Sequence, residues 1–210
     1  PKETYKGVDY QMLPSDIVGD DDGGQTATWA ASHRQSLSSN KDTGEGWPGC
    51  RDIDHKSGNV RNNYNAYLKF LLEDLGYAGF RYDMVKGFAP EYVAQYNQTV
   101  QPQFSVGEYW DNSTATKLWV NGTKVNNVPQ SAAFDFPFRY TVRDAANSGD
   151  WSKLENASNA PLINSRQFRQ YAVTFVENHD TQMRSASEPL DPIKKDTLAA
   201  NAYLLAMPGT

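Results

Sequence analysis

Three apolar segments of the chain each end next to acidic side chains. The segment 171–176 is rich in apolar and β-branched residues and leads to His179 and Asp180, while Asp83 and Glu108 follow two similar segments upstream. Buried strands of a parallel sheet are nearly continuous apolar runs, and in closed βα barrels the reactive groups project from the carboxyl ends of the strands. The pattern therefore predicts acids at the ends of three strands of one barrel, although each acid alone could be a solvated residue or a helix cap.

The spacing of these acids fits repeated strand–helix units. Asp83 and Glu108 are 25 residues apart, which is enough for one strand, one helix and their loops. Glu108 and Asp180 are 72 residues apart, which leaves room for two units with residues 132–136 as the intermediate strand. The sequence predicts the other strands at 77–82, 104–107 and 171–176, and helices at 60–75, 90–99, 138–146 and 192–207.

The surroundings of two acids suggest different protonation states. Arg81 and Asp83 are two residues apart, so both side chains point to one face of the strand, and the cation favours an ionised carboxylate that can attack. A structural ion pair is the alternative. Glu108 precedes Tyr109 and Trp110, whose rings exclude water and favour the protonated form of a carboxyl. One charged and one protonated carboxyl is the arrangement that glycoside hydrolysis requires.

Four motifs resemble those of one enzyme family. The segments GFRYDMVKG (79–87), VGEYW (106–110) and FVENHD (175–180) resemble, in order and spacing, segments on strands four, five and seven of the α-amylase family, glycoside hydrolase family 13. The tetrapeptide RDID (51–54) is similar to the acidic motif near the end of the family's domain B. The resemblance covers the chain from about Gly49 onward.

The resemblance implies roles for the residues that match. Asp83 would be the nucleophile, Glu108 the acid/base, and Asp180 the third carboxylate, which binds sugar hydroxyls and helps to distort the ring. His179 would bind the same sugar, and Arg81 would orient Asp83.

Two further positions would bind substrate and two would bind metal. Lys86 would contact sugar on the leaving-group side, and Trp110 would belong to the substrate-binding surface. Asp52 and the carbonyl of Gly87 would bind a structural Ca²⁺, an ion that prefers carboxylate and carbonyl oxygens. For Asp52 the alternative is a solvated acid or a helix cap. Gly87 stands where many members have His, which leaves the family resemblance intact and alters the subsite.

The fold class that follows is α/β, an incomplete (β/α)8 TIM barrel with roughly strands four to seven. Four strands of eight can be counted, and about 250 residues is typical of such a barrel, so we expect the chain of 210 residues to be incomplete. Residues 1–55 are expected to be the C-terminal part of the irregular domain B, and residues 56–210 part of the catalytic barrel.

The expected function is retaining, endo-acting hydrolysis of α-1,4-glucosidic bonds in starch, glycogen and maltooligosaccharides. An α-glucosidase, a maltooligosaccharide-forming amylase or a transglycosylase of the same family is the alternative. A non-catalytic binding subunit is disfavoured because all three carboxylates are present. The partner would be an α-glucan, the full-length protein would be a monomer, and family resemblance suggests a secreted or periplasmic location.

Composition agrees with this interpretation. The net charge is −5 and hydrophobic residues make up 39% of the chain, which describes a soluble, mildly acidic protein and gives no electrostatic case for nucleic acid. The sequence shows no long apolar stretch that would indicate a membrane partner. Cys50 is the single cysteine, so an intrachain disulfide is excluded.

Overall fold

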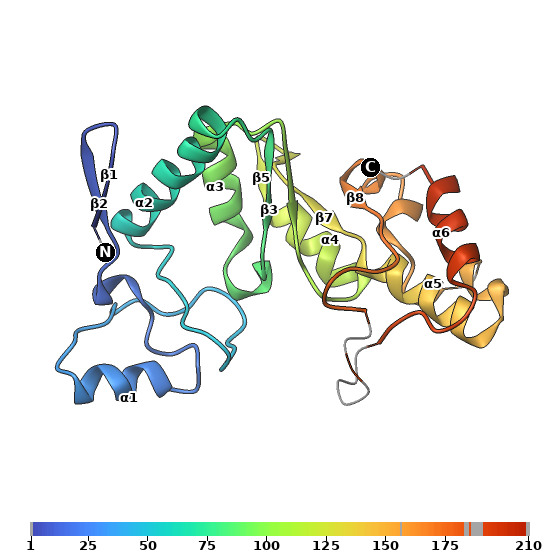
Figure 1. The fold of residues 1–210 in the computed structure, drawn as a ribbon, viewed down its shortest axis with the longest axis horizontal. Coiled ribbons are helices and arrows are strands. Elements are labelled where there is room, and N and C mark those ends of the chain that lie inside the picture. Colours follow the sequence, from blue (N-terminus) through green and yellow to red (C-terminus); the bar gives the residue numbers. More distant parts are fainter. Residues whose placement is uncertain (1, 156, 183–184, 186–190, 209–210) are drawn as a thin grey trace. The chain divides into compact units, whose positions relative to one another are not determined.

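The computed structural model describes residues 2–155, 157–182, 185 and 191–208. The chain divides into two compact units, one made of Pro1–Ser105 with Gly122–Gln130 and the other of Val106–Asn121 with Ser131–Thr210. Figure 1 shows the elements of both units.

The first unit contains short strands and three α-helices. Its elements are the hairpin β1 (Lys2–Tyr5) and β2 (Val8–Gln11), α1 (Gln25–Ser32), α2 (Gly58–Lys69), a π-helical turn (Phe70–Asp74), β3 (Gly79–Tyr82), a 3-10 turn (Val85–Gly87), α3 (Pro90–Val100) and the hairpin β5 (Lys124–Val125) and β6 (Val128–Pro129). The predicted helices at 60–75 and 90–99 are therefore present with small shifts of their ends. The structure adds two regular elements, the first hairpin and α1, to the region that the sequence suggested was irregular.

The core of the first unit lies between β3 and the two helices that flank it. Leu68 of α2, Phe80 of β3, and Tyr92 and Tyr96 of α3 form a buried cluster. His55 is also buried, stacks on Phe88 with ring centroids 4.2 Å apart, and shares a 2.8 Å hydrogen bond between its Nδ1 and the hydroxyl of Tyr96. This packing fixes β3 and the turn that follows it.

The second unit contains the parallel strands that follow β3 in the sheet. Strand β4 (Phe104–Gly107) crosses the boundary between the units, and α4 (Ser113–Gly122), β7 (Ala132–Phe134), α5 (Phe136–Ser148), β8 (Ala172–Val173) and α6 (Thr197–Ala206) come after it. Strand β4 pairs in parallel with β7 and β7 with β8, and the sheet order is β3-β4-β7-β8. The predicted parallel sheet with alternating helices is confirmed.

Several predicted boundaries in the second unit differ from the observed ones. Strand β8 ends at Val173 and β7 ends at Phe134, so both are shorter than expected. The side chain of Asp135 ends β7 because it caps α5, accepting a hydrogen bond from the backbone N–H of Phe138 at 3.1 Å. The last helix begins at Thr197 instead of residue 192, and α4 lies where no helix was predicted.

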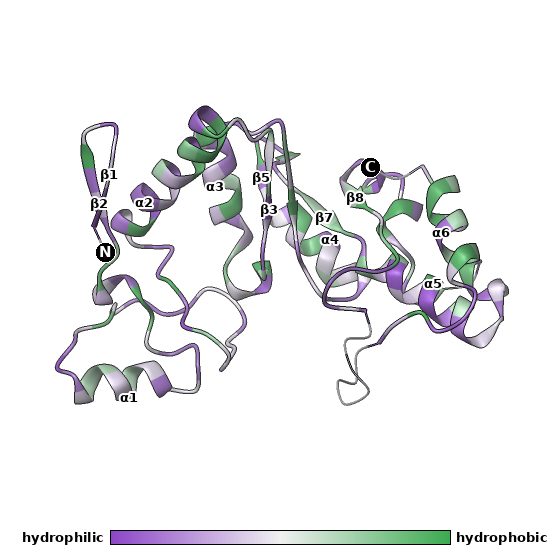
Figure 2. Cartoon of the chain, in the orientation of Figure 1, coloured by the Kyte–Doolittle hydropathy of each residue, from purple (hydrophilic) through white to green (hydrophobic). Residues whose placement is uncertain are grey.

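Helix α6 packs on α5 and leaves an apolar surface exposed. The rings of Phe138 and Tyr203 stack with centroids 5.7 Å apart. Leu198 and Leu205 of α6 are almost fully exposed, and Figure 2 shows α6 coloured mostly as apolar. Within the described ranges, none of the helices combines the length and the apolar character needed to cross a membrane.

Candidate active site

The end of β3 carries a closely paired cation and carboxylate. Arg81 donates to the Oδ1 of Asp83 at 2.7 Å, as expected for two side chains on one face of a strand. The side chain of Asp83 is 70% exposed, so a ligand can reach this carboxylate. Met84 follows with a left-handed backbone (φ 41°, ψ 47°), which turns the chain away from the strand direction.

A loop of residues 42–50, which we call the docked loop, is fixed against the segment that follows β3. The N–H of Glu45 donates to the carbonyl oxygen of Lys86 at 2.8 Å, and the Nζ of Lys86 lies 3.0 Å from the Oε2 of Glu45. The N–H of Ala89 donates to the Oγ1 of Thr43 at 3.1 Å. A Cβ at Gly44 would collide with the backbone of Gly87, so only glycine allows this approach. Sequence reasoning missed this loop.

The docked loop places a second carboxylate beside Asp52. Burial, together with a hydrogen bond to the side chain of Asp42 and the negative charge of Asp42, raises the pKa of Asp52 to about 8. The Oδ1 of Asp42 also accepts from the N–H of Gly44 at 3.1 Å, and Gly44 contacts the backbone of Gly87. Asp52 and Gly87, which the sequence proposed as metal ligands, are thus linked through Asp42 and Gly44.

This arrangement has the donor chemistry that Ca²⁺ prefers. Two carboxyl groups in hydrogen-bond contact repel one another when both are ionised, unless a cation or a shared proton lies between them. Ca²⁺ accepts backbone carbonyls as well as carboxylates, so the pair Asp42 and Asp52 and a carbonyl such as that of Gly87 suit it. Among the described residues, no group of three or more His, Cys, Asp or Glu side chains forms a metal-binding cluster. Asp42 and Asp52 are therefore the side-chain candidates for such a site, and backbone carbonyls would have to supply further oxygen ligands.

The end of β4 carries a buried acid. Glu108 is 2% exposed, directly after the strand residue Gly107. A Cβ at Gly107 would collide with the ring of Trp119, so this position needs glycine for Trp119 to pack against the strand. The rings of Trp110 and Phe136 are in tilted contact with centroids 4.3 Å apart, and the ring centroids of Tyr109 and Trp119 are 6.0 Å apart. The two aromatic residues that follow Glu108 thus each contact another aromatic ring.

The FVENHD motif forms a tight turn after β8. The Nε2 of His179 lies 2.9 Å from the Oδ2 of Asp180, and both side chains are accessible to solvent. The Oδ1 of Asn178 accepts from the N–H of Asp180 at 3.0 Å and from that of Thr181 at 2.9 Å. Asn178 therefore holds the backbone that presents the His–Asp pair.

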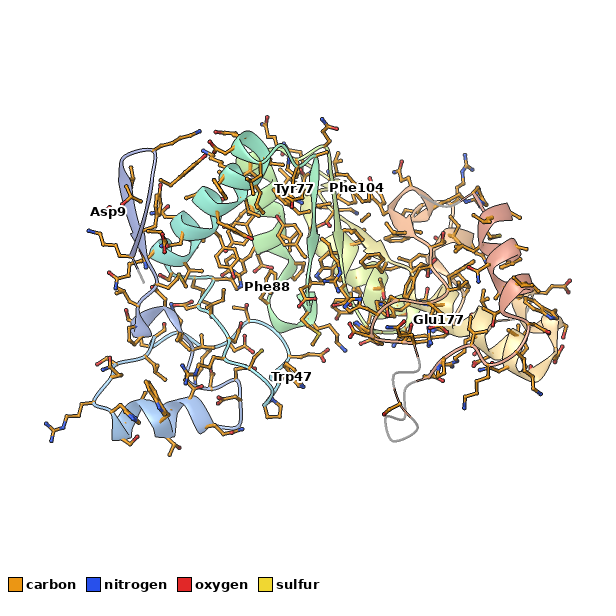
Figure 3. The ribbon with its side chains drawn as sticks, viewed as in Figure 1. Asp9, Trp47, Tyr77, Phe88, Phe104 and Glu177 are labelled. Carbon is orange, nitrogen blue, oxygen red and sulfur yellow. The ribbon has the colours of Figure 1, made fainter. Side chains whose placement is uncertain are left out.

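Glu177, labelled in Figure 3, anchors the base of this turn. Its carboxylate accepts from the hydroxyl of Thr181 at 2.6 Å and from the N–H of Ile193 at 2.5 Å. The guanidinium of Arg139, whose side chain is 1% exposed, lies 3.6 Å from the same carboxylate. Sequence reasoning missed Arg139, since nothing near it in the sequence indicates a partner 38 positions away.

Asp135 is a further buried acid that the sequence did not single out. It is fully buried and accepts three backbone N–H groups, from Phe138, Leu162 and Ile163, at 2.9 to 3.1 Å. Burial raises the pKa of its carboxyl, and the three hydrogen bonds oppose that shift. Its role is to join β7, α5 and the 3-10 turn Leu162–Asn164.

The candidate residues fall into two groups by unit. Arg81, Asp83, Lys86, Asp52 and Gly87 belong to the first unit, and Glu108, Trp110, His179 and Asp180 belong to the second. Within each unit the chemistry is at strand ends or in the turns that follow them. Parallel strands that alternate with helices and end in carboxylates are typical of βα-barrel enzymes.

Comparisons with known proteins agree with this class. The chain is 30% identical over 186 residues to "Alpha-amylase 3, chloroplastic" of Arabidopsis thaliana, and 30% identical over 185 residues to "Probable alpha-amylase 2" of the same organism. Each match covers 81% of the chain, which spans only 20% and 43% of the lengths of these relatives. No protein-family model matches the chain. The names of relatives include a chloroplastic and a cytoplasmic amylase, so their locations are mixed.

A solved structure shows the same fold. The pullulanase from Anoxybacillus sp. LM18-11, complexed with maltotetraose, superimposes with a TM-score of 0.51 at 19% identity, covering 70% of this chain and 25% of that one. The fold and the sequence homology together assign the chain to the α-amylase family, glycoside hydrolase family 13.

Proposed function

We propose that the protein hydrolyses α-1,4-glucosidic bonds in starch, glycogen and maltooligosaccharides, with endo action and retention of configuration. The observation that carries the proposal is the order of the three motifs that end in Asp83, Glu108 and Asp180, within a chain homologous to α-amylases over 81% of its length.

In the first step, the carboxylate of Asp83 attacks the anomeric carbon while Glu108 protonates the departing glycosidic oxygen. The pairing of Arg81 with Asp83 at 2.7 Å supports this assignment, because the cation holds the carboxylate in one orientation. The product is a covalent glycosyl ester of Asp83 and a free sugar end. In the second step, Glu108 takes a proton from water, which attacks the ester and releases a sugar with its original configuration.

Asp180, His179, Lys86 and Trp110 bind the substrate in this proposal. The carboxylate of Asp180 and the ring of His179 are accessible and can hydrogen-bond sugar hydroxyls. Lys86 contacts sugar on the leaving-group side. The ring of Trp110 is held against Phe136, which gives it a fixed orientation.

Asp42, Asp52 and the carbonyl of Gly87 would hold a structural Ca²⁺. The contact of two carboxyl groups and the docking of residues 42–45 on Lys86–Ala89 support this site. Bound calcium would neutralise the two carboxylates and fasten the docked loop to the turn after β3.

The alternative functions keep the same chemistry and change the substrate or acceptor. An α-glucosidase would release glucose from chain ends, a maltooligosaccharide-forming amylase would release one main product, and a transglycosylase would pass the glycosyl unit to a sugar. Gly87, which stands where many members of the family have His, is compatible with each of these alternatives. We also propose that the full-length protein is a monomer and that it is secreted or periplasmic.

Product analysis tests the proposal. The protein is incubated with starch, maltotriose and sucrose, the products are separated by chromatography, and the configuration of new reducing ends is followed by NMR. Mixed maltooligosaccharides released early from starch, with α configuration, are the expected result. Glucose alone, a single oligomer or longer products would indicate one of the alternatives, and absence of cleavage would contradict the proposal.

A further inference from the structure

Trp47 is a large aromatic residue on the docked loop with half of its surface exposed to solvent. The backbone N–H of Trp47 donates to the Oδ1 of Asp21 at 2.8 Å, which fixes the backbone at this position. A Cβ at Gly49 would collide with the six-membered part of the Trp47 ring, so the indole lies directly against Gly49. The ring therefore contacts Gly49 and keeps half of the residue's surface open to solvent; Figure 3 labels the position of Trp47.

The docked loop contacts the turn that follows β3 close to Trp47. Two residues before Trp47, Glu45 is bonded to Lys86 through its backbone and its side chain. One residue earlier, Gly44 lies against the backbone of Gly87. Trp47 thus follows residues that are fixed against the turn that carries Lys86, three positions after Asp83.

Trp29 is a second exposed tryptophan of the first unit, and its ring already stacks on another side chain. His33 stacks on it with ring centroids 4.3 Å apart and an interplanar angle of 19°, and the guanidinium of Arg51 lies over it at 4.9 Å. Its exposure, 41%, is similar to the 50% of Trp47. The ring of Trp29 therefore already stacks on a side chain of its own protein, whereas the ring of Trp47 lies against Gly49.

We propose that Trp47 is a sugar-stacking platform that binds one glucosyl unit of an α-glucan on the Lys86 side of Asp83. The inference rests on the proposed function, which supplies the glucan. A pyranose ring presents C–H groups on a flat face, and an indole offers a large rigid apolar surface that costs little conformational entropy to order. Lys86 and Glu45, which pair at 3.0 Å where the same loop meets the turn after β3, offer a donor and an acceptor for sugar hydroxyl groups.

The test compares four variants with maltooligosaccharides of increasing length. For Trp47→Ala we expect KM to rise about three- to tenfold for substrates long enough to reach the platform, with kcat within about twofold, because the lost contact is a stacking interaction. Trp47→Phe should restore most of the affinity. Gly49→Ala should raise KM as Trp47→Ala does, because the new methyl group displaces the ring. Trp29→Ala is the matched control and should leave KM unchanged.

Direct binding separates this inference from the proposed function. Calorimetric titration with maltoheptaose uses Glu108→Gln protein, with and without Trp47→Ala, after circular dichroism has shown that each variant is folded. Weaker binding in the double variant supports the platform, whether or not the wild-type protein cleaves glucan. Absence of cleavage by the wild type would overturn the proposed function and leave the platform standing. Equal affinity of the two proteins, or no affinity in either, overturns the platform.

Discussion

The guanidinium of Arg139 on α5 lies 3.6 Å from the carboxylate of Glu177, and this ion pair holds the base of the turn that carries His179 and Asp180. Arg139 is 1% exposed, and it also donates to the backbone carbonyl oxygen of Asp191. Glu177 in turn binds Thr181 and Ile193. The pair thus connects a helix to both sides of the segment between residues 177 and 193.

We predict that Arg139→Met lowers the free energy of unfolding by about 2 to 3 kcal/mol, because it leaves the partly buried Glu177 carboxylate without its cation. Urea denaturation followed by circular dichroism measures the change. Adding Glu177→Gln to Arg139→Met should recover part of the loss, since it removes the stranded charge. Additive losses in this double-mutant cycle would show that the two residues do not interact energetically.

Asp83→Asn is expected to reduce starch hydrolysis by at least about a thousandfold while the protein stays folded, because an amide cannot attack the anomeric carbon. Reducing-sugar release measures activity, and thermal melting checks the fold. Glu91→Gln, which changes an exposed acid in the first turn of α3, is the matched control and should keep full activity. Normal turnover of Asp83→Asn would remove Asp83 as the nucleophile.

Glu108→Gln separates the acid/base from the nucleophile. The variant should lose starch hydrolysis but retain the first step with an α-glucosyl fluoride, whose leaving group departs without protonation. Added azide should then speed product formation, because a small anion attacks the glycosyl ester without a general base. Equal loss with both substrates and no rescue by azide would require the roles to be reassigned.

Removal of calcium should lower the melting temperature if Asp42 and Asp52 hold the ion. At a free calcium concentration about 100 times the Kd, binding contributes about 2.7 kcal/mol to stability, and a chelator removes this contribution. Asp42→Asn and Asp52→Asn should melt at a temperature that no longer depends on chelator. Asp54→Asn is a control, because the Asp54 carboxylate is bound to Ser38 and Asn40 at 2.7 Å and its variant should keep the chelator effect. An unchanged melting temperature of the wild type would contradict the site.

We predict that the folded protein loses stability in mild acid because His55 is buried. Burial lowers the pKa of His55 to about 4, from an ordinary value of 6.5, and the nearby Asp54 opposes this only in part. Since the folded-state pKa is below the unfolded one, the folded state favours neutral His55. Its contribution is complete above pH 6.5 and is lost as the pH falls toward 4, with a total of about 3 kcal/mol.

Denaturation midpoints at pH 7, 5.5 and 4.5 measure this effect against two variants. In His55→Gln the pH dependence between 6.5 and 4 should be weaker than in the wild type. His33→Gln, at an exposed histidine, should leave it unchanged. Identical pH profiles for His55→Gln and the wild type would show that His55 does not titrate in this window.

Local signals in the sequence predicted some elements closely. Strand β4 has its predicted ends, and α3 begins at Pro90, where the helix was predicted to start. The pairing of Arg81 with Asp83 also follows from strand periodicity alone. The carboxylate motifs could be recognised because their residues are close together in the sequence.

Contacts between residues far apart in the sequence were not predictable in this way. The pairs Arg139–Glu177 and Lys86–Glu45 join residues 38 and 41 positions apart, and no composition or period marks either pair. The first hairpin was missed because its turn, Lys6-Gly7, lacks the usual Asn-Gly signal, although both residues have the positive φ values of such a turn.

The docked loop is attached to the turn after β3 mainly through backbone atoms and a glycine. This kind of attachment affects how freely the sequence of the loop can change in evolution. The N–H of Glu45 and the carbonyl of Lys86 remain whatever side chains occupy those positions, and Gly44 is the glycine that this contact with the turn requires. Residues 46–50 could therefore vary in identity and number without disturbing the turn that carries Asp83 and Lys86. Selection can change which sugars this protein holds while its bond-breaking residues stay as they are.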